Sequence, residues 1–194
     1  MPSVTCPGIN TNAFLDCTKP MLPGVSDMLY LFNWADIATI TENVSYPNLI
    51  EGLTLTGSAK IYRFEGKKSS NEPKSTLVEG RYQPSFTHEV VFKMFNIDSL
   101  TKQQLEYMCN TKVVAIVENN YKGTDGEVPY EIYGLRAGLQ MRALERVLND
   151  QDTLGAYNCT LGTSDIDKEP YLPATLFDTD YATTKAIITA LFTA

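Results

Sequence analysis

The stretch PSFTHEVVFKMFNIDSLTKQQLEYMCNTKVVAIVEN, Pro84 to Asn119, places three elements directly one after another. Its first part alternates with a period of two, which is typical of a β-strand with two different faces. One face carries Phe86, His88, Val90 and Phe92, and the other carries Thr87, Glu89, Val91 and Lys93. Its last part, Val113–Glu118, is a short β-branched run that predicts a strand buried on both faces. The stretch therefore predicts a mainly β fold.

A short helix is predicted between these two strands, at about residues 101–110. Thr101 stands where a capping box begins, because a glutamine follows three residues later. Leu105, Met108 and Cys109 have helical spacing and form one apolar stripe that suits packing on a sheet. Asn110 is a residue type that often ends a helix in the left-handed conformation.

A long hairpin is predicted upstream, at about residues 60–95. Its two strands are Tyr62–Glu65 and Phe86–Phe92. The tip between them, Gly66–Ser75, is rich in lysine and serine and contains a proline, which indicates an exposed loop.

The chain before the hairpin divides into two parts. Residues 1–24 hold four prolines and show no periodicity, so they predict an extended N-terminal arm. Ser26 to Ile40 is dense in apolar residues and predicts one buried strand with Trp34 in the core. Residues 25–194 are expected to form a single domain.

Further strands are predicted after the central stretch, at Tyr130–Tyr133, Leu139–Leu148 and Leu154–Leu161. Thr179 is expected to cap a final helix near the end of the chain, although Thr183, Thr184 and Ile187 also suit a strand. The expected fold is an antiparallel β-sandwich or open barrel of about seven or eight strands, with one helix packed on it.

Composition limits the possible functions. The 194 residues are 43% hydrophobic and 20% charged, which suits a globular core. No apolar run approaches the roughly 18 residues of a membrane-spanning helix, and the first residues do not resemble a secretory signal. The net charge of −7 disfavours sequence-independent binding to a phosphate backbone.

Metal and cofactor sites are not expected. Four cysteines and a single histidine offer no compact zinc spacing, and the cysteines are expected to be free thiols. The loop NNYKGTDGEVP, Asn119–Pro129, fails the spacing of a calcium loop and lacks the ending of a phosphate-binding loop.

Catalytic signatures are also missing. His88 lies within an apolar strand, where a core or interface histidine is the simpler interpretation. The carboxylate pairs Asp165/Asp167 and Asp178/Asp180 lie in polar segments that would not raise a pKa. The sequence thus argues against an enzyme.

Five segments carry a resemblance to a known family. They are PSFTHEVVFKMF, LTKQQLEYMCN, TKVVAIVEN, YGLRAGL and GAYNCTL, within about Asp27 to Leu172. In this order they resemble the tail-tube proteins of tailed bacteriophages, or related ring-forming tail proteins.

The resemblance implies a structural virion protein, made in the host cytoplasm and placed in the phage tail. Its strands would join those of identical subunits in a closed ring, with a hexamer favoured and a higher order possible, and the rings would either stack into a hollow tube or stand singly at a tail joint. Other tail or ring proteins would be its partners, and double-stranded DNA would pass through the lumen without specific binding. A net-negative wall would let that DNA slide.

The resemblance also implies inter-subunit contacts. Lys67 to Lys74 match the long inter-subunit loop, and the two hairpin strands match the lining of the barrel. The implied contact residues are Tyr62, Phe64, Lys67, Lys68, Lys74, Phe86 and His88.

Two other classes remain open. The alternative to a ring is a β-sandwich binding module that recognises a sugar or a protein through the loop Asn119–Tyr130. The third class is an enzyme that works through His88. The proline-rich arm is longer than a plain tube subunit needs, which favours a specialised ring.

Overall fold

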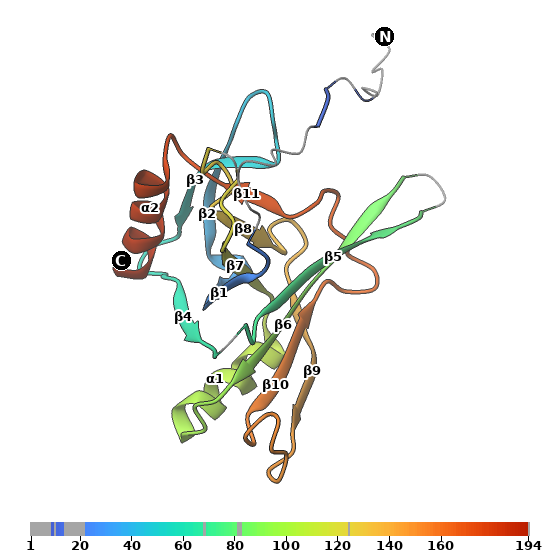
Figure 1. The fold of residues 1–194 in the computed structure, drawn as a ribbon, viewed down its shortest axis with the longest axis vertical. Helices are drawn as coiled ribbons and strands as arrows, with labels where there is room; N and C mark the ends of the chain where they lie inside the picture. The colour runs from blue at the N-terminus through green and yellow to red at the C-terminus, as the bar shows by residue number, and fades with distance from the viewer. Residues whose placement is uncertain are drawn as a thin grey trace.

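The computed structural model describes residue 9 and residues 11–13, 22–67, 69–80, 83–123 and 125–193. Most of the predicted N-terminal arm, residues 1–24, therefore lies outside the described residues, as do Cys6 and Cys17. The described part is mainly β, with two sheets and two α-helices (Figure 1). The predicted fold class is confirmed, although the strands number eleven.

The larger sheet, sheet A, has seven strands. In spatial order they are β2 (Ile37–Glu42), β3 (Leu49–Leu55), β11 (Ala174–Leu176), β8 (Tyr130–Tyr133), β7 (Val113–Asn119), β1 (Val25–Asn33) and β4 (Tyr62–Glu65). Neighbouring strands are antiparallel except β11 and β3, which run parallel.

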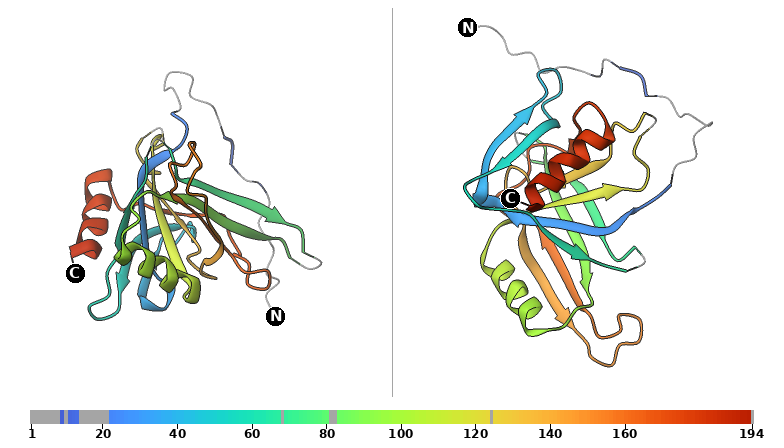
Figure 2. Two further views of the ribbon diagram at one scale, coloured as in Figure 1. Left: turned by 90° about the horizontal axis from the view of Figure 1, so that it is seen from below. Right: turned by 90° about the vertical axis from the view of Figure 1, so that its left-hand side faces the viewer.

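The smaller sheet, sheet B, has four antiparallel strands. In spatial order they are β5 (Glu72–Val78), β6 (Ser85–Met94), β10 (Tyr157–Gly162) and β9 (Gln140–Arg146). In the right-hand view of Figure 2 these strands run up the page, whereas β1 and β4 of sheet A cross the page at a steep angle. The two sheets therefore pack in the crossed manner of an orthogonal sandwich.

Among the described residues, a separate apolar core covers each of the two faces of sheet A. Between the sheets, Val90 and Phe92 of β6 pack with Ala115 of β7 and with Leu105 of α1 (Ser99–Asn110). On the opposite face, the helix α2 (Tyr181–Thr193) buries Ile188 and Leu191 against strands that include β7. The prediction that Val113–Glu118 is covered on both faces is thus confirmed.

The predicted hairpin at residues 60–95 is wrong in its pairing. β4, which was expected to pair with Phe86–Phe92, pairs instead with β1 of sheet A. The expected tip contains β5, and this strand pairs with β6 from Glu72↔Val91 to Val78↔Ser85. A hairpin is present, but it joins β5 to β6. The alternation of β6 itself is confirmed, since His88, Val90, Phe92 and Met94 are buried.

The predicted single strand Ser26–Ile40 is interrupted. The short 3-10 turn Trp34–Asp36 separates β1 from β2, and the two strands lie at different places in sheet A. Trp34 is half-buried rather than central, and its indole Nε1 donates to the Leu135 carbonyl at 3.2 Å. A tryptophan at a bend can thus keep one polar end satisfied.

The first helix differs from its prediction at both ends. Asp98, not Thr101, is the N-cap, and its carboxylate accepts from the Thr101 amide at 2.7 Å. Leu105 and Met108 are buried as predicted, but Cys109 is exposed. Thr111 ends the helix in an extended conformation, so the proposed left-handed terminator Asn110 is not used.

The C-terminal part follows the sequence pattern more closely. The strand at Tyr130–Tyr133 and the final helix are confirmed. Asp180, rather than Thr179, receives the Thr183 amide at the start of that helix. Among the described residues, no helix is both long enough and apolar enough to span a membrane.

Candidate functional site

Sheet B ends in two edge strands, each of which is paired on one side only. Within the described chain, β5 pairs only with β6, and β9 pairs only with β10. The four strands alternate in direction, so the two edge strands run antiparallel to each other. An edge strand presents free backbone N–H and C=O groups, which favour pairing with a further strand. A second copy could therefore join edge to edge without breaking the antiparallel order.

Each edge of sheet B also carries an exposed leucine. Leu77 on β5 lies opposite Phe86, and Leu144 on β9 lies opposite the buried Cys159. Both leucines therefore belong to the face of the sheet that covers the core, yet they are 61% and 39% exposed. Each side chain is left partly uncovered because the sheet stops beside it.

The two edges of sheet B are staggered. β5 covers β6 from Ser85 to Val91, whereas β9 follows β10 toward the opposite end of the sheet. The β5–β6 hairpin consequently projects from the body (Figure 1), and Figure 2 shows the same projection from below. A stagger of this kind is what strands of a closed barrel require.

The outer face of sheet B is polar and balanced in charge. Cross-strand registers place these side chains on it: Glu72, Val91, Thr160 and Ala143 in one row, Lys74, Glu89, Gly162 and Gln140 in the next, and Lys93, Asn158 and Glu145 in a third. A Cβ on Gly162 would lie 3.1 Å from Arg142 Cγ, so Arg142 also belongs to this face.

Two ion pairs involve side chains of this outer face. Lys74 Nζ lies 2.7 Å from Glu89 Oε1, and Arg142 lies 2.8 Å from the carboxylate of Asp165. Three acids and three bases thus share the face, which leaves the net negative charge of the chain elsewhere on the surface.

His88 anchors the root of the projecting hairpin. Its Nδ1 accepts a hydrogen bond from the Gly134 amide at 3.2 Å, so Nε2 carries the proton and donates to the Tyr171 carbonyl at 3.0 Å. Tyr133 contacts the ring edge-on, with centroids 5.5 Å apart. Burial lowers the pKa of His88 to about 4. Both ring nitrogens are therefore engaged within the fold.

Glu169 ties the same region together and was not expected from the sequence. Its backbone pairs with that of Phe86, with N···O distances of 2.8 and 2.9 Å. Its buried carboxylate accepts from the Arg136 and Ala137 amides, at 3.1 and 2.9 Å to Oε1. Burial raises the pKa of this carboxyl group, although the amides oppose the effect. We call His88, Glu169 and Tyr171 the hairpin clamp.

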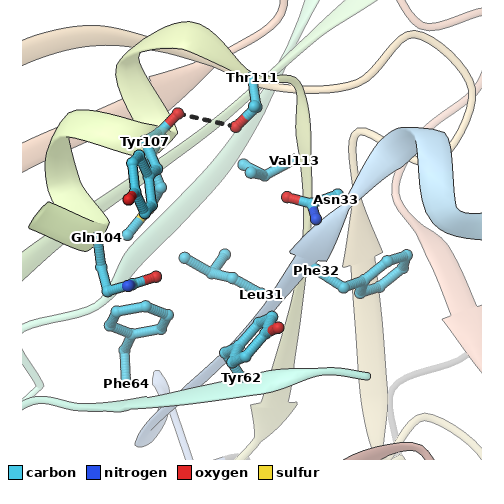
Figure 3. A pocket seen from close by; sticks show the side chains of 10 residues that line it. Leu31, Phe32, Asn33, Tyr62, Phe64, Gln104, Tyr107, Thr111 and Val113 are labelled. Carbon is cyan, nitrogen blue, oxygen red and sulfur yellow. Dashed lines mark hydrogen bonds between the residues drawn. The ribbon is translucent and has the colours of Figure 1, made fainter. Parts of the chain in front are cut away.

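A groove lies between α1 and the edge of sheet A (Figure 3). It has a volume of about 410 Å³, and its walls are mainly apolar and aromatic. Figure 3 shows Gln104 and Tyr107 of α1 facing Leu31, Tyr62 and Phe64. Phe64 also packs against Phe92, with centroids 6.3 Å apart.

The contact residues implied by the resemblance fall into two groups. Tyr62 and Phe64 line the groove, whereas Lys67 lines a separate hollow, with its Nζ 5.2 Å from the Phe95 ring centre. Lys74 lies on β5 rather than at a loop tip, because that part of the predicted tip is a strand. The second group consists of Lys74, Phe86 and His88, on or beneath the β5–β6 hairpin. Lys68 lies outside the described residues.

Polar side chains of the loop Asn119–Pro129 form hydrogen bonds and an ion pair with other residues of the same chain. Lys122 Nζ lies 3.2 Å from Glu118 and donates to the Asn119 carbonyl. Asn120 donates to the Pro23 carbonyl at 3.3 Å. Among the described residues, no group of three His, Cys, Asp or Glu side chains is placed to hold a metal ion.

Comparison with known proteins adds no relative: no family model, no curated protein and no solved structure matches this chain.

Proposed function

We propose that this protein is a structural subunit that closes into a homo-oligomeric ring and lines a channel, in the manner of phage tail proteins. The observation that carries the proposal is sheet B, with two free antiparallel edges and an exposed leucine at each. β5 of one copy pairs with β9 of the next, and repetition of this heterologous contact closes a ring.

The number of strands in the proposed ring sets the width of its channel. Six copies of sheet B would make a barrel of about 24 strands, and a strand spacing of about 4.8 Å gives a circumference of roughly 115 Å. The backbone-to-backbone width would then be roughly 37 Å before strand tilt, which increases it. A channel of this width admits duplex DNA.

The outer face of sheet B suits a channel wall. Its cross-strand rows contain small side chains such as Ala143, Thr160 and Gly162, which leave the wall smooth. Two of its three bases are ion-paired, Lys74 with Glu89 and Arg142 with Asp165. Such a wall gives DNA little net attraction, because gripping a phosphate backbone requires unpaired cations. The negative wall suggested by composition is thus replaced by a balanced one.

The second candidate function is a binding module, and the groove of Figure 3 favours it more than the loop does. A groove of about 410 Å³ with aromatic walls and a few polar groups has the size of a small-ligand or peptide site. This alternative would need no contact between copies.

Native mass spectrometry with size-exclusion light scattering tests the ring directly. The Leu77→Glu and Leu144→Glu variants each place a charge on one edge of sheet B, so we expect them to release monomers from the assembled protein. Ile166→Glu is the matched control, since Ile166 is exposed but lies on neither edge strand. A wild-type chain that stays monomeric at high concentration would overturn the proposal.

A further inference from the structure

The groove between α1 and the edge of sheet A contains no charged side chain. None of the ten residues that line it is an acid or a base (Figure 3). A neighbouring hollow, which we call the β4 hollow, differs because Lys60, Arg63 and Glu65 contribute to its walls. Burial of an ion is costly where no group of opposite charge meets it. The groove therefore favours an uncharged ligand.

Aromatic rings form much of the surface of the groove. Tyr62 of β4 and Tyr107 of α1 both line it, although they are 50% and 55% exposed. Phe64 lies two residues after Tyr62 on the same strand, so the two rings share the face of β4 that is directed toward α1. Figure 3 shows Tyr62 and Tyr107 on opposite sides of Leu31. The groove thus offers flat apolar surfaces on two walls.

Polar groups of the groove are left without a partner inside the protein. Among the described residues, the side-chain amide of Gln104 and the hydroxyls of Tyr62 and Tyr107 form no hydrogen bond. Asn33 uses only its Nδ2 atom within the fold, and the Thr111 hydroxyl donates to a helix carbonyl but can still accept. A purely apolar ligand would cover these groups without satisfying them, which is unfavourable. The ligand should therefore carry hydrogen-bonding groups of its own.

Size and position also limit what the groove can hold. Its volume of about 410 Å³ is within the range of about 300–1,000 Å³ that is typical of small-ligand sites. Tyr62, Phe64 and Gln104 line both the groove and the β4 hollow, so a longer ligand can continue from one into the other. No residue that lines the groove belongs to β5 or β9, the strands assigned to ring closure. The site does not compete with the proposed ring for these residues.

We propose that the groove is a binding site for a neutral oligosaccharide. A pyranose ring has an apolar C–H face, which packs on an aromatic ring, and a rim of hydroxyls that both donate and accept hydrogen bonds. The tyrosine rings match the first feature, and the amides of Asn33 and Gln104 match the second. The site therefore involves α1 and β4 rather than the loop Asn119–Tyr130. It acts whether or not the copies close into a ring.

Saturation-transfer-difference NMR on the intact chain tests the ligand class. The neutral probes are oligosaccharides of glucose, galactose, mannose or N-acetylglucosamine. The charged probe is trigalacturonic acid, and the peptide probe is a capped hexapeptide of alternating valine and threonine. We expect at least one neutral sugar to bind, and neither of the other probes. The proposal is overturned if no neutral sugar binds, or if the charged probe or the peptide binds as well as the neutral sugars.

Surface variants locate the bound sugar. Tyr107→Ala removes one aromatic wall at an exposed helix position and should weaken binding about three- to tenfold. Gln104→Leu keeps the size of the side chain but removes the amide, so it should weaken binding by a similar factor. Tyr46→Ala is the matched control, since Tyr46 is 70% exposed and lies between β2 and β3 at the opposite edge of sheet A. This control should bind like wild type.

Two readouts separate this site from the ring proposal. Thermal unfolding of each variant shows that the chain still folds, and unchanged sugar binding in both groove variants would then overturn the proposal. Native mass spectrometry of the same samples reports the number of copies. A monomer that binds the sugar through Tyr107 and Gln104 would refute the ring and leave the oligosaccharide site standing, whereas a ring that binds no neutral sugar would do the reverse.

Discussion

Glu169→Ala should be among the most destabilising substitutions outside the apolar core. The alanine keeps the backbone pairing with Phe86 but removes the carboxylate that receives the Arg136 and Ala137 amides. Each buried donor left without a partner costs about 1–3 kcal/mol. Loss of the desolvated charge recovers part of that cost, because burial already raises the pKa of Glu169. We expect a net loss of about 2–4 kcal/mol.

Differential scanning calorimetry and urea unfolding measure this loss. For a chain of this length, about 2–4 °C of Tm corresponds to 1 kcal/mol, so Glu169→Ala should lower the Tm by roughly 4–16 °C. Glu169→Gln keeps one oxygen acceptor and should cost about 1 kcal/mol. Glu65→Ala is the surface control, expected within about 0.5 kcal/mol of wild type. An unfolding free energy for Glu169→Ala equal to that of the surface control would refute the role of the clamp.

Three further predictions concern other parts of the fold. His88 has a folded-state pKa of about 4 against an ordinary 6.5, so its contribution to the unfolding free energy is complete above pH 6.5 and falls by up to about 3 kcal/mol as the pH drops to 4. His88→Gln should flatten this part of the stability–pH curve measured by urea unfolding, and an unchanged curve would contradict the prediction. In a chain carrying Cys6→Ser and Cys17→Ser, a thiol reagent should modify the exposed Cys109 within minutes. The buried Cys159, whose pKa is raised to about 12, should react only after unfolding, and equal modification rates in the native protein, read by mass spectrometry, would contradict this prediction. Ile116→Ala should cost about 2–5 kcal/mol by chemical unfolding, because Ile116 is fully buried beneath α2, and a cost below 1 kcal/mol would show that this core is loose.

Local sequence patterns predicted the elements in which the burial of successive side chains follows a regular pattern. β6 alternates because one face covers the core, and β7 is continuously apolar because both faces are covered. The two helices also appeared from spacing alone, although their caps did not. Asp98 stands three residues before the proposed cap Thr101, and Asp180 stands one residue after the proposed cap Thr179, which reflects how many side chains near a helix start can accept an amide.

Long-range pairing was the part that sequence could not supply. β4 pairs with β1, more than 30 residues away, and no local signal distinguishes that partner from β6. β5 contains Pro73 and Lys74, which resemble a loop but are also residues that protect an edge strand. Glu169 lies in the polar run DKEP, and its burial comes from partners distant in the sequence, the turn at Arg136 and the backbone of Phe86.

Hydrogen–deuterium exchange on the edge strands β5 and β9 tests the central claim most directly. In the assembled protein, the amides of both strands that point away from β6 and β10 should be protected, and this protection should disappear when the ring is dissociated into monomers by dilution or by Leu77→Glu. Core amides of β7 should stay protected in both states. Fast exchange of β5 and β9 in a particle that is demonstrably assembled would contradict the account, because the copies would then be joined by some other surface.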